Sequence, residues 1–337
     1  MLNSLQRSSP ITATVDLNKK GIQHGHLRLP YSRDDSAWGS VMIPICVIAN
    51  NEGPTALLTG ANHGDEYEGP AALFELAQTI DPAEVNGRII IVPALNYPAF
   101  CAGTRTSPID RGNLNRSFPG RADGTVTEKI ADYVTRYLIP LADIVLDFHS
   151  GGKTLDFLPY AAAHELPNKD QEANCFAAVQ AFNAPFSMKM LEIDAVGMLD
   201  TTVEEMGKVF VTTELGGAGT ATATSIEIAR KGTCNILRHV GILKGNIDIR
   251  PSQWLDMPSD DCFTFAQNDG LIAFNCNLGD KVKKGATIAR IYPLGKTGIA
   301  PVEYHAALDG VLAARHVPGL IKTGDCLSVI ATITETI

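Results

Sequence analysis

The chain has 337 residues, of which 45% are hydrophobic and 19% are charged, and both proportions are ordinary for a globular protein. Its formal net charge is -9, which argues against nucleic acids and anionic membranes as partners because both attract basic surfaces. No segment approaches the roughly 18 apolar residues of a membrane span, and the N-terminus carries no apolar secretory core. We therefore expect no nucleic-acid partner and no membrane partner.

The seven cysteines are scattered along the chain and form no C-x-x-C pair. This pattern makes a disulfide framework or a cysteine-based zinc site an unattractive interpretation, and it predicts a cytoplasmic protein.

The first 40 residues are mixed and turn-rich, and we interpret them as an N-terminal extension. Beyond them, apolar runs of strand length alternate with helical patterns, an order that predicts an α/β domain with a mostly parallel central sheet. The expected strands cover residues 40–50, 55–60, 88–95, 142–152 and 209–217. The expected helices cover residues 69–80, 127–138, 169–182, 199–206 and 223–240.

The pattern changes after residue 250. Short strands with Gly-Asp and Lys-Gly turns follow, and two segments, 270–291 and 309–331, are loosely self-similar. We therefore predict a catalytic domain over residues 1–249 and a small all-β domain over residues 250–337.

Three of the expected buried strands end in the same way, with a polar or charged residue followed by glycine. These ends deliver His63 with Glu66, then His149, and then Glu214. In an open parallel sheet, ligands bind just beyond the carboxyl ends of the strands, so residues far apart in sequence can meet there. Two histidines and one glutamate are a sufficient ligand set for a catalytic zinc ion. Asp147 shares one face of its strand with His149 and could orient that ring.

A fourth charged strand end remains if His63, Glu66 and His149 hold the metal. Glu214 would then be placed to take a proton from a water held by the metal and to return it to a leaving amine.

A long polar loop over residues 96–124 holds a second group of functional candidates, and loops of this length are usually functional or disordered. It contains three arginines and two asparagines: Arg105, Arg111, Asn113, Asn115 and Arg116. An arginine fork binds a carboxylate through two hydrogen bonds, and a second arginine near the metal could stabilise an oxyanion.

Four stretches, "GANHGDEYEG", "NLNRSFPG", "VLDFHSGG" and "TTELGG", occur in this order. Together they resemble the succinylglutamate desuccinylase/aspartoacylase family of zinc-dependent amidohydrolases, and the resemblance covers residues 40–337. It implies a zinc-carboxypeptidase-like α/β/α domain followed by a small barrel-sandwich-like β domain. Within the family, the loop and the last stretch look most like the branch that deacetylates N-α-acetyl-L-2,4-diaminobutyrate in ectoine breakdown.

Carried over position by position, the resemblance implies one zinc ion per subunit, held by His63, Glu66 and His149. It implies that Glu214 is the general base that activates the water held by this ion.

The same resemblance assigns residues of the long loop to the substrate. Asn115 and Arg116 match the pair that grips the α-carboxylate. Arg105 matches the arginine that polarises the carbonyl, although Arg111 lies close to the same register. The implied partner is a small N-acyl amino acid, and the family resemblance also implies a homo-oligomer.

A diaminobutyrate side chain ends in an ammonium group, which requires an acidic or carbonyl-rich wall. The stretch "MLEIDAVGMLD" offers three acids for this wall: Glu192, Asp194 and Asp200. A succinylglutamate or N-acylaspartate substrate would instead require a spare basic residue, and Lys189 is the only one nearby.

Three alternative hypotheses about function remain open. The C-terminal segment resembles the hairpins of biotinyl and lipoyl carrier domains, with Lys296 as the lysine that would be modified, although the usual flanking residues are missing. A carboxypeptidase acting on peptides would use the same metal site in a larger pocket. A binding protein that had lost its metal would keep the scaffold without catalysis.

Overall fold

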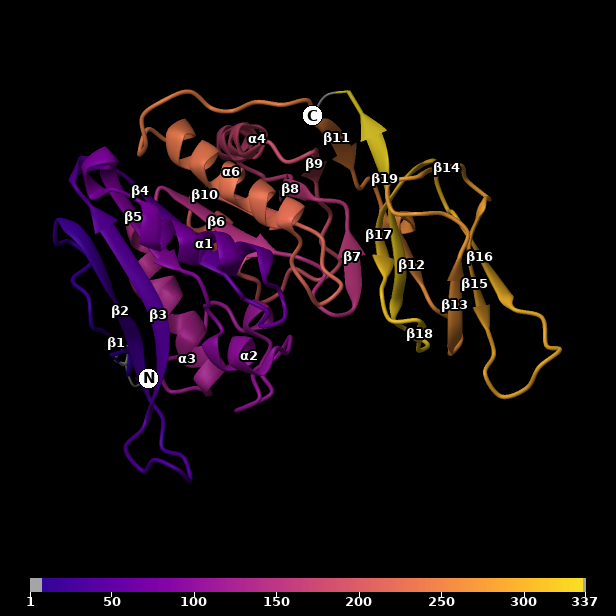
Figure 1. Cartoon of the computed structure of the whole chain (residues 1–337), viewed down its shortest axis with the longest axis horizontal. Coiled ribbons are helices and arrows are strands. Elements are labelled where there is room, and N and C mark those ends of the chain that lie inside the picture. Colours follow the sequence, from indigo (N-terminus) through magenta and orange to yellow (C-terminus); the bar gives the residue numbers. More distant parts are fainter. Residues whose placement is uncertain (1–7, 336–337) are drawn as a thin grey trace, which may run out of the picture.

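The computed structural model describes residues 8–335. Figure 1 shows an α/β body joined to a C-terminal β lobe. The strands of the body are β1 (Thr12–Ala13), β2 (Gly21–Pro30), β3 (Ser40–Ala49), β4 (Asn51–Gly60), β5 (Asn86–Val92), β6 (Ile144–His149), β7 (Leu155–Phe157), β8 (Tyr160–Ala163), β9 (Phe186–Lys189) and β10 (Val209–Glu214). The helices are α1 (Glu68–Thr79), α2 (Tyr97–Ala102), α3 (Val126–Tyr133), α4 (Lys169–Phe182), α5 (Leu199–Glu205) and α6 (Ala223–His239).

Helices cover both faces of the central sheet, and the apolar strand β5 shows why. Ile89 and Ile91 pack into a cluster with residues of α1, α4 and α6. Ile90 and Val92 point the other way, into a cluster with residues of α3 and α5. Successive side chains of a strand point to opposite faces, so a strand buried on both faces must be apolar at every position.

The sheet is mixed, which corrects part of the expectation. Its four central strands run in the order β5-β4-β6-β10, and all three of their pairings are parallel. Antiparallel pairs flank this centre, with β3 against β5 on one side and β8 against β10 on the other. The parallel expectation therefore holds for the centre and not for the whole sheet.

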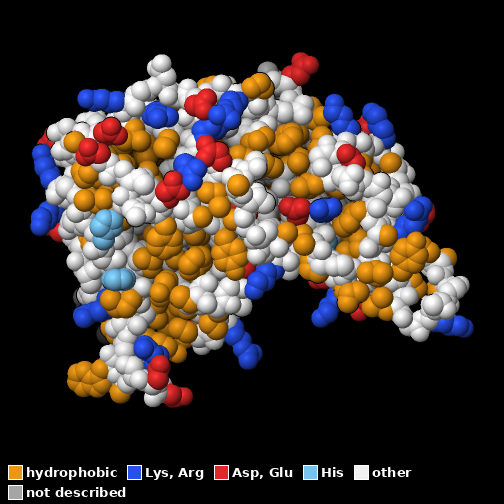
Figure 2. All heavy atoms as spheres, in the orientation of Figure 1, with side chains coloured by type: hydrophobic (Ala, Val, Ile, Leu, Met, Phe, Trp, Pro, Cys, Tyr) orange, Lys and Arg blue, Asp and Glu red, His pale blue; other side chains and the backbone are white. Residues whose placement is uncertain are grey.

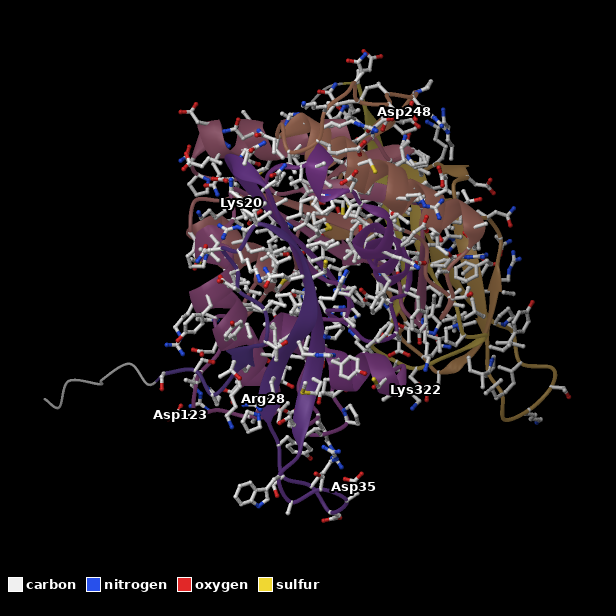
Figure 3. All side chains as sticks on the ribbon, turned by 60° about the vertical axis from the view of Figure 1, so that its left-hand side comes forward. Lys20, Arg28, Asp35, Asp123, Asp248 and Lys322 are labelled. Atoms are coloured by element: carbon white, nitrogen blue, oxygen red, sulfur yellow. The ribbon has the colours of Figure 1, made fainter. Side chains whose placement is uncertain are left out.

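The residues expected to form only a mixed extension include a long strand. β2 pairs antiparallel with β3 over its full length, and β1 adds to its outer edge. Residues 1–7 of that extension lie outside the described residues. The connection between β2 and β3 projects from the body, as the position of Asp35 shows in Figure 3.

Short helical turns complete the body and the lobe. They are η1 (Pro82–Glu84), η2 (Leu114–Arg116), η3 (Val134–Leu138), η4 (Ile139–Leu141) and η5 (Asp260–Cys262). The long polar loop is partly ordered by them, because it contains η2 as well as α2. The turn η3 continues α3, whose start is fixed by a capping box between Thr125 and Glu128.

Up to residue 335, the regular elements of the C-terminal lobe are strands, apart from the turn η5. They are β11 (Gln253–Asp256), β12 (Phe263–Phe265), β13 (Gly270–Phe274), β14 (Lys281–Val282), β15 (Thr287–Tyr292), β16 (Val302–His305), β17 (Gly310–His316), β18 (Leu320–Ile321) and β19 (Cys326–Thr334). β11 pairs with β9 of the body and with β19 of the lobe, so one sheet runs through both. A second sheet has the order β16-β15-β13-β18.

The surface is indented between the body and the β lobe (Figure 2). Within residues 8–335, no helix has the length and apolar character needed to cross a membrane.

Candidate active site

The first candidate ligands lie just beyond β4, where the chain leaves the sheet and has not yet entered α1. His63 and Glu66 are almost completely buried there. The Nδ1 atom of His63 lies 2.8 Å from Oε1 of Glu66. The spacing of three residues therefore brings an imidazole nitrogen and a carboxylate oxygen together at the carboxyl end of a central strand.

His149 reaches the same carboxylate from the end of the neighbouring strand β6. Its Nδ1 atom lies 3.0 Å from Oε2 of Glu66, and the ring centroids of His149 and His63 are 5.0 Å apart. The two histidines, 86 positions apart in sequence, thus meet around one glutamate because β4 and β6 are parallel neighbours.

Asp147 orients the His149 ring. Its Oδ2 atom lies 2.8 Å from Nε2 of His149. Asp147 is itself held by hydrogen bonds from Thr59 at 2.6 Å and from Asn62 at 3.0 Å. A carboxylate behind a histidine is the arrangement that fixes ring orientation in metal sites. Sequence reasoning identified Asp147 but missed Asn62, although Asn62 directly precedes His63.

These three side chains fit a divalent metal ion. One potential ligand atom from each of His63, Glu66 and His149 lies within 4.8 Å of the others. Burial disfavours a charged Glu66, yet the two neighbouring imidazoles hold its pKa well below the ordinary value, so it is a carboxylate. Imidazole nitrogens with a carboxylate oxygen are a donor set that zinc takes in catalytic sites.

Glu214 ends β10 and lies opposite His149 in the parallel pairing of β10 with β6. Burial, followed by the charge of Glu66, raises the pKa of Glu214 well above its ordinary value. Its Oε2 atom is buried and has no hydrogen-bond partner among the described residues, and the same holds for Nε2 of His63. Both side chains line one cavity, so the cavity contains polar atoms that lack a protein partner.

This cavity has a volume of about 120 Å³ and brings together the residues that sequence reasoning selected. Its walls are formed by His63, Glu66, Arg105, Asn115, Arg116, His149, Met190, Glu192, Met198, Asp200, Thr212 and Glu214.

The structure distinguishes the arginines of the long loop. Arg105 lines the cavity and lies 3.4 Å from Glu66, whereas Arg111 is exposed and is not among the lining residues. Arg116 lines the cavity at the end of η2, and its Nε atom lies 3.7 Å from the exposed carboxylate of Asp194. The geometry therefore places Arg105, and not Arg111, beside the candidate metal ligands.

Asn115 is buried, and its side-chain oxygen already accepts two hydrogen bonds within the protein. This oxygen accepts hydrogen bonds from Asn62 at 3.2 Å and from the backbone N–H of Leu199 at 2.9 Å. The amide nitrogen of Asn115 is thereby left as the group that can donate to a ligand. The same bond to Leu199 ties the cavity wall to the first turn of α5.

A second hollow of about 300 Å³ shares Arg105, Arg116 and Glu214 with the cavity and opens toward the β lobe. Phe263, Phe265 and Val329 of that lobe form part of its wall. The C-terminal strands therefore contribute to the approach to the cavity. Lys296, in contrast, is exposed in the connection between β15 and β16, at the outer end of the lobe (Figure 1).

Comparisons with known proteins identify relatives of this chain. Residues 52–240 match the succinylglutamate desuccinylase/aspartoacylase catalytic domain. The chain is 52% identical to the N-α-acetyl-L-2,4-diaminobutyric acid deacetylase of Halomonas elongata over 98% of both chains. It is 62% identical to the product-bound structure of the ectoine utilization protein EutE (DoeB) from Ruegeria pomeroyi, with a TM-score of 0.96 over 97% of this chain and 99% of that one. A succinylglutamate desuccinylase/aspartoacylase structure from Rhodobacter sphaeroides is 35% identical, with a TM-score of 0.92 over 97% of this chain and 100% of that one.

Proposed function

The chain belongs to the succinylglutamate desuccinylase/aspartoacylase family, and from this premise we propose that it deacetylates N-α-acetyl-L-2,4-diaminobutyrate in ectoine breakdown. The observation that carries the proposal is one cavity lined by His63, Glu66, His149 and Glu214 together with Arg116. It contains a metal-binding donor set, a base, and a cationic group for a carboxylate. The relatives at 52% and 62% identity support the choice of substrate.

In this proposal His63, Glu66 and His149 hold one zinc ion per subunit. When bound, the ion supplies a Lewis acid for the acetyl carbonyl and lowers the pKa of the attacking water. Asp147 keeps the His149 ring in the orientation that this requires, through the 2.8 Å contact.

Glu214 acts as the general base and then as the general acid. It accepts a proton from the water whose oxygen attacks the acetyl carbon, and it delivers that proton to the α-nitrogen as the C–N bond breaks. The products are acetate and L-2,4-diaminobutyrate. A carboxyl whose pKa is already raised by burial and by Glu66 holds a transferred proton more readily than an exposed one does.

The arginines and Asn115 position the substrate. Arg105 donates to the carbonyl oxygen, where negative charge develops during attack. Arg116 binds the α-carboxylate by its guanidinium fork, and the amide nitrogen of Asn115 adds a third hydrogen bond. Holding the carboxylate at a fixed point places the acetyl carbon beside the attacking water.

A substrate panel tests the proposal. Acetyl, succinyl and formyl derivatives of diaminobutyrate, aspartate, glutamate and ornithine are assayed with zinc-loaded protein. We expect N-α-acetyl-L-2,4-diaminobutyrate to give the highest kcat/KM. A higher value for an N-acyl aspartate or glutamate would replace the proposal with an aspartoacylase-like or desuccinylase-like activity, and a comparable rate on a tetrapeptide would replace it with a carboxypeptidase activity.

Glu214→Gln tests the base. The substitution keeps the shape of the side chain and removes its ability to accept a proton, so we expect a loss of about 10³-fold or more in kcat. Zinc content, measured by elemental analysis, should stay near one equivalent because Glu214 is not among the proposed ligands. Glu205→Gln, at an exposed position of α5, is the matched control and should keep the wild-type rate.

A further inference from the structure

A group of titratable residues adjoins the cavity and has no part in the proposed chemistry. Its members are His164, which follows β8, Glu192, which follows β9, and Asp200 and Glu204 in α5. Potential ligand atoms of His164, Glu192 and Asp200 lie within 4.8 Å of one another. Glu192 and Asp200 both line the cavity that contains the candidate metal ligands.

The group has an excess of negative charge. Nδ1 of His164 lies 2.9 Å from Glu204, and its Nε2 lies 3.6 Å from Glu192. Although burial opposes a charged ring, the neighbouring carboxylates of Glu192 and Glu204 raise the pKa of His164 to about 10, so the ring is an imidazolium. One cation thus faces three carboxyl groups, and its short ion pair with Glu204 leaves Glu192 and Asp200 incompletely neutralised.

Asp200 is the most deeply placed of these carboxyl groups, with only 5% of its surface exposed. Its Oδ1 atom accepts a hydrogen bond from the backbone N–H of Thr201. Among residues 8–335, its Oδ2 atom has no hydrogen-bond partner. Burial and the charge of Glu192 raise the pKa of Asp200 to about 6, against the opposing charge of His164. A largely buried carboxylate with an oxygen that accepts no hydrogen bond from the described residues, in the wall of a ligand cavity, is a suitable acceptor for a cationic N–H donor.

The basic side chains near this wall are already paired. Lys189 lies 3.3 Å from Asp256 and is not among the residues that line the cavity. Arg105, at the metal-binding end, pairs with Glu66. Arg116, which also lines the cavity, is assigned to the α-carboxylate. An acidic substrate side chain would therefore find two carboxylates here and no further cation, whereas an ammonium group would find two acceptors.

We propose that Glu192 and Asp200 form the subsite that binds the side-chain ammonium of the substrate and selects cationic over neutral and acidic N-acyl amino acids. The inference rests on the proposed deacylase function and adds the residues that determine its specificity. Asp194, the third acid of the same stretch, is excluded because it is exposed and lies near Arg116.

A divalent metal ion is the competing occupant of this group. His164 is not among the residues that line the cavity, so from this group an occupant of the cavity meets the carboxylates of Glu192 and Asp200 alone, whereas catalytic zinc sites use three protein ligands. An ammonium ion has three N–H donors and is held by two such acceptors. The two carboxylates of this group that line the cavity therefore favour the ammonium group.

The test compares two substrates that differ only at the side-chain end. N-acetyl-L-norvaline carries a methyl group where N-α-acetyl-L-2,4-diaminobutyrate carries the ammonium. For wild type we expect kcat/KM to favour the cationic substrate by about 30-fold or more, since a buried acceptor left without its donor weakens binding strongly. In Glu192→Gln/Asp200→Asn this ratio should fall to about 3-fold or less, while the norvaline rate stays within about 3-fold of wild type.

Glu205→Gln is the control and should keep the wild-type ratio. A ratio unchanged in the double variant would overturn the proposal. Parallel loss of both rates would also overturn it, because that is the result of a purely structural role. Elemental analysis tests the metal alternative. A second metal equivalent in wild type that disappears in the double variant would assign the group to a metal ion.

A binding measurement separates this inference from the proposed function. Calorimetry on the zinc-loaded protein compares L-2,4-diaminobutyrate with L-norvaline and requires no catalysis. Preferential binding of diaminobutyrate that the double variant loses would support the subsite even if the enzyme favoured another acyl group. Equal binding of the two amino acids by wild type would overturn the subsite even if deacetylation were observed.

Discussion

Asp200→Asn is expected to make the ligand-free protein more stable. In the folded chain the pKa of this carboxyl rises from 3.8 to about 6 because the group is buried and lies near Glu192. Each unit of difference between the folded and unfolded pKa values corresponds to about 1.4 kcal/mol, so ionised Asp200 destabilises the fold by up to about 3 kcal/mol at neutral pH. Asparagine is neutral and keeps an oxygen for the N–H of Thr201.

The pH dependence of this effect has a definite sign. A raised carboxyl pKa means that the folded state binds the proton more tightly than the unfolded state does. The destabilisation is therefore small below pH 4, grows between about pH 4 and pH 6, and is constant above that range. The stability gained by Asp200→Asn should follow the same course, with the full gain at pH 8 and roughly half of it at pH 5.

The assay is urea unfolding at pH 8 and pH 5, with Glu205→Gln as the control. We expect Asp200→Asn to gain roughly 1–3 kcal/mol at pH 8, and the exposed control to change by less than about 0.5 kcal/mol. Adding L-2,4-diaminobutyrate should stabilise wild type more than Asp200→Asn, since the ammonium neutralises the carboxylate. A variant less stable than wild type at pH 8 would refute the reasoning.

Two further predictions concern the substrate carboxylate and the packing beneath the site. Arg116→Ala should lower kcat/KM about 100-fold in steady-state assays, because it removes a charge-assisted hydrogen-bonded pair with the substrate carboxylate. The control Arg111→Ala should change kcat/KM by less than about 3-fold. Equal losses in the two variants would contradict the role of Arg116 in binding the carboxylate. Gly69→Ala places a Cβ 2.1 Å from Cβ of Phe148, and this overpacking, about 3 kcal/mol, outweighs the gain of about 1 kcal/mol in helix propensity. Urea midpoints should therefore fall for Gly69→Ala and stay unchanged for Gly295→Ala, where nothing lies within 4 Å; a neutral Gly69→Ala would contradict this packing.

The strand ends of the site could be predicted because strands buried on both faces are continuous apolar runs. Such runs mark β4, β6 and β10 in the sequence, and the polar residues that follow them lie at one edge of a parallel sheet. This local signal was enough to predict that His149 and Glu214 lie close together, and the observed register pairs them directly.

The edges of the sheet could not be predicted in the same way. β2 has exposed and partly buried residues in alternation over its first half, so its apolar signal is weak. Its position depends on ten pairings with β3, and the antiparallel contact of β10 with β8 likewise depends on long-range pairing. Local sequence does not specify either.

The environments of Lys189, at the end of β9, and of the acids that follow it could not be predicted from the sequence either. The sequence alone gives no reason to prefer one of Glu192, Asp194 and Asp200 over the others, and it does not show that Lys189 is paired. Only side-chain directions distinguish them, because Asp194 lies near Arg116 and Lys189 is paired with Asp256.

The central claim is that one metal ion at His63, Glu66 and His149 is required for deacetylation, and the direct measurement is the rate of N-α-acetyl-L-2,4-diaminobutyrate hydrolysis after metal removal and replacement. We expect chelation to abolish the rate and one equivalent of zinc per chain to restore it. Full activity in protein shown by elemental analysis to be free of divalent metal would contradict the account.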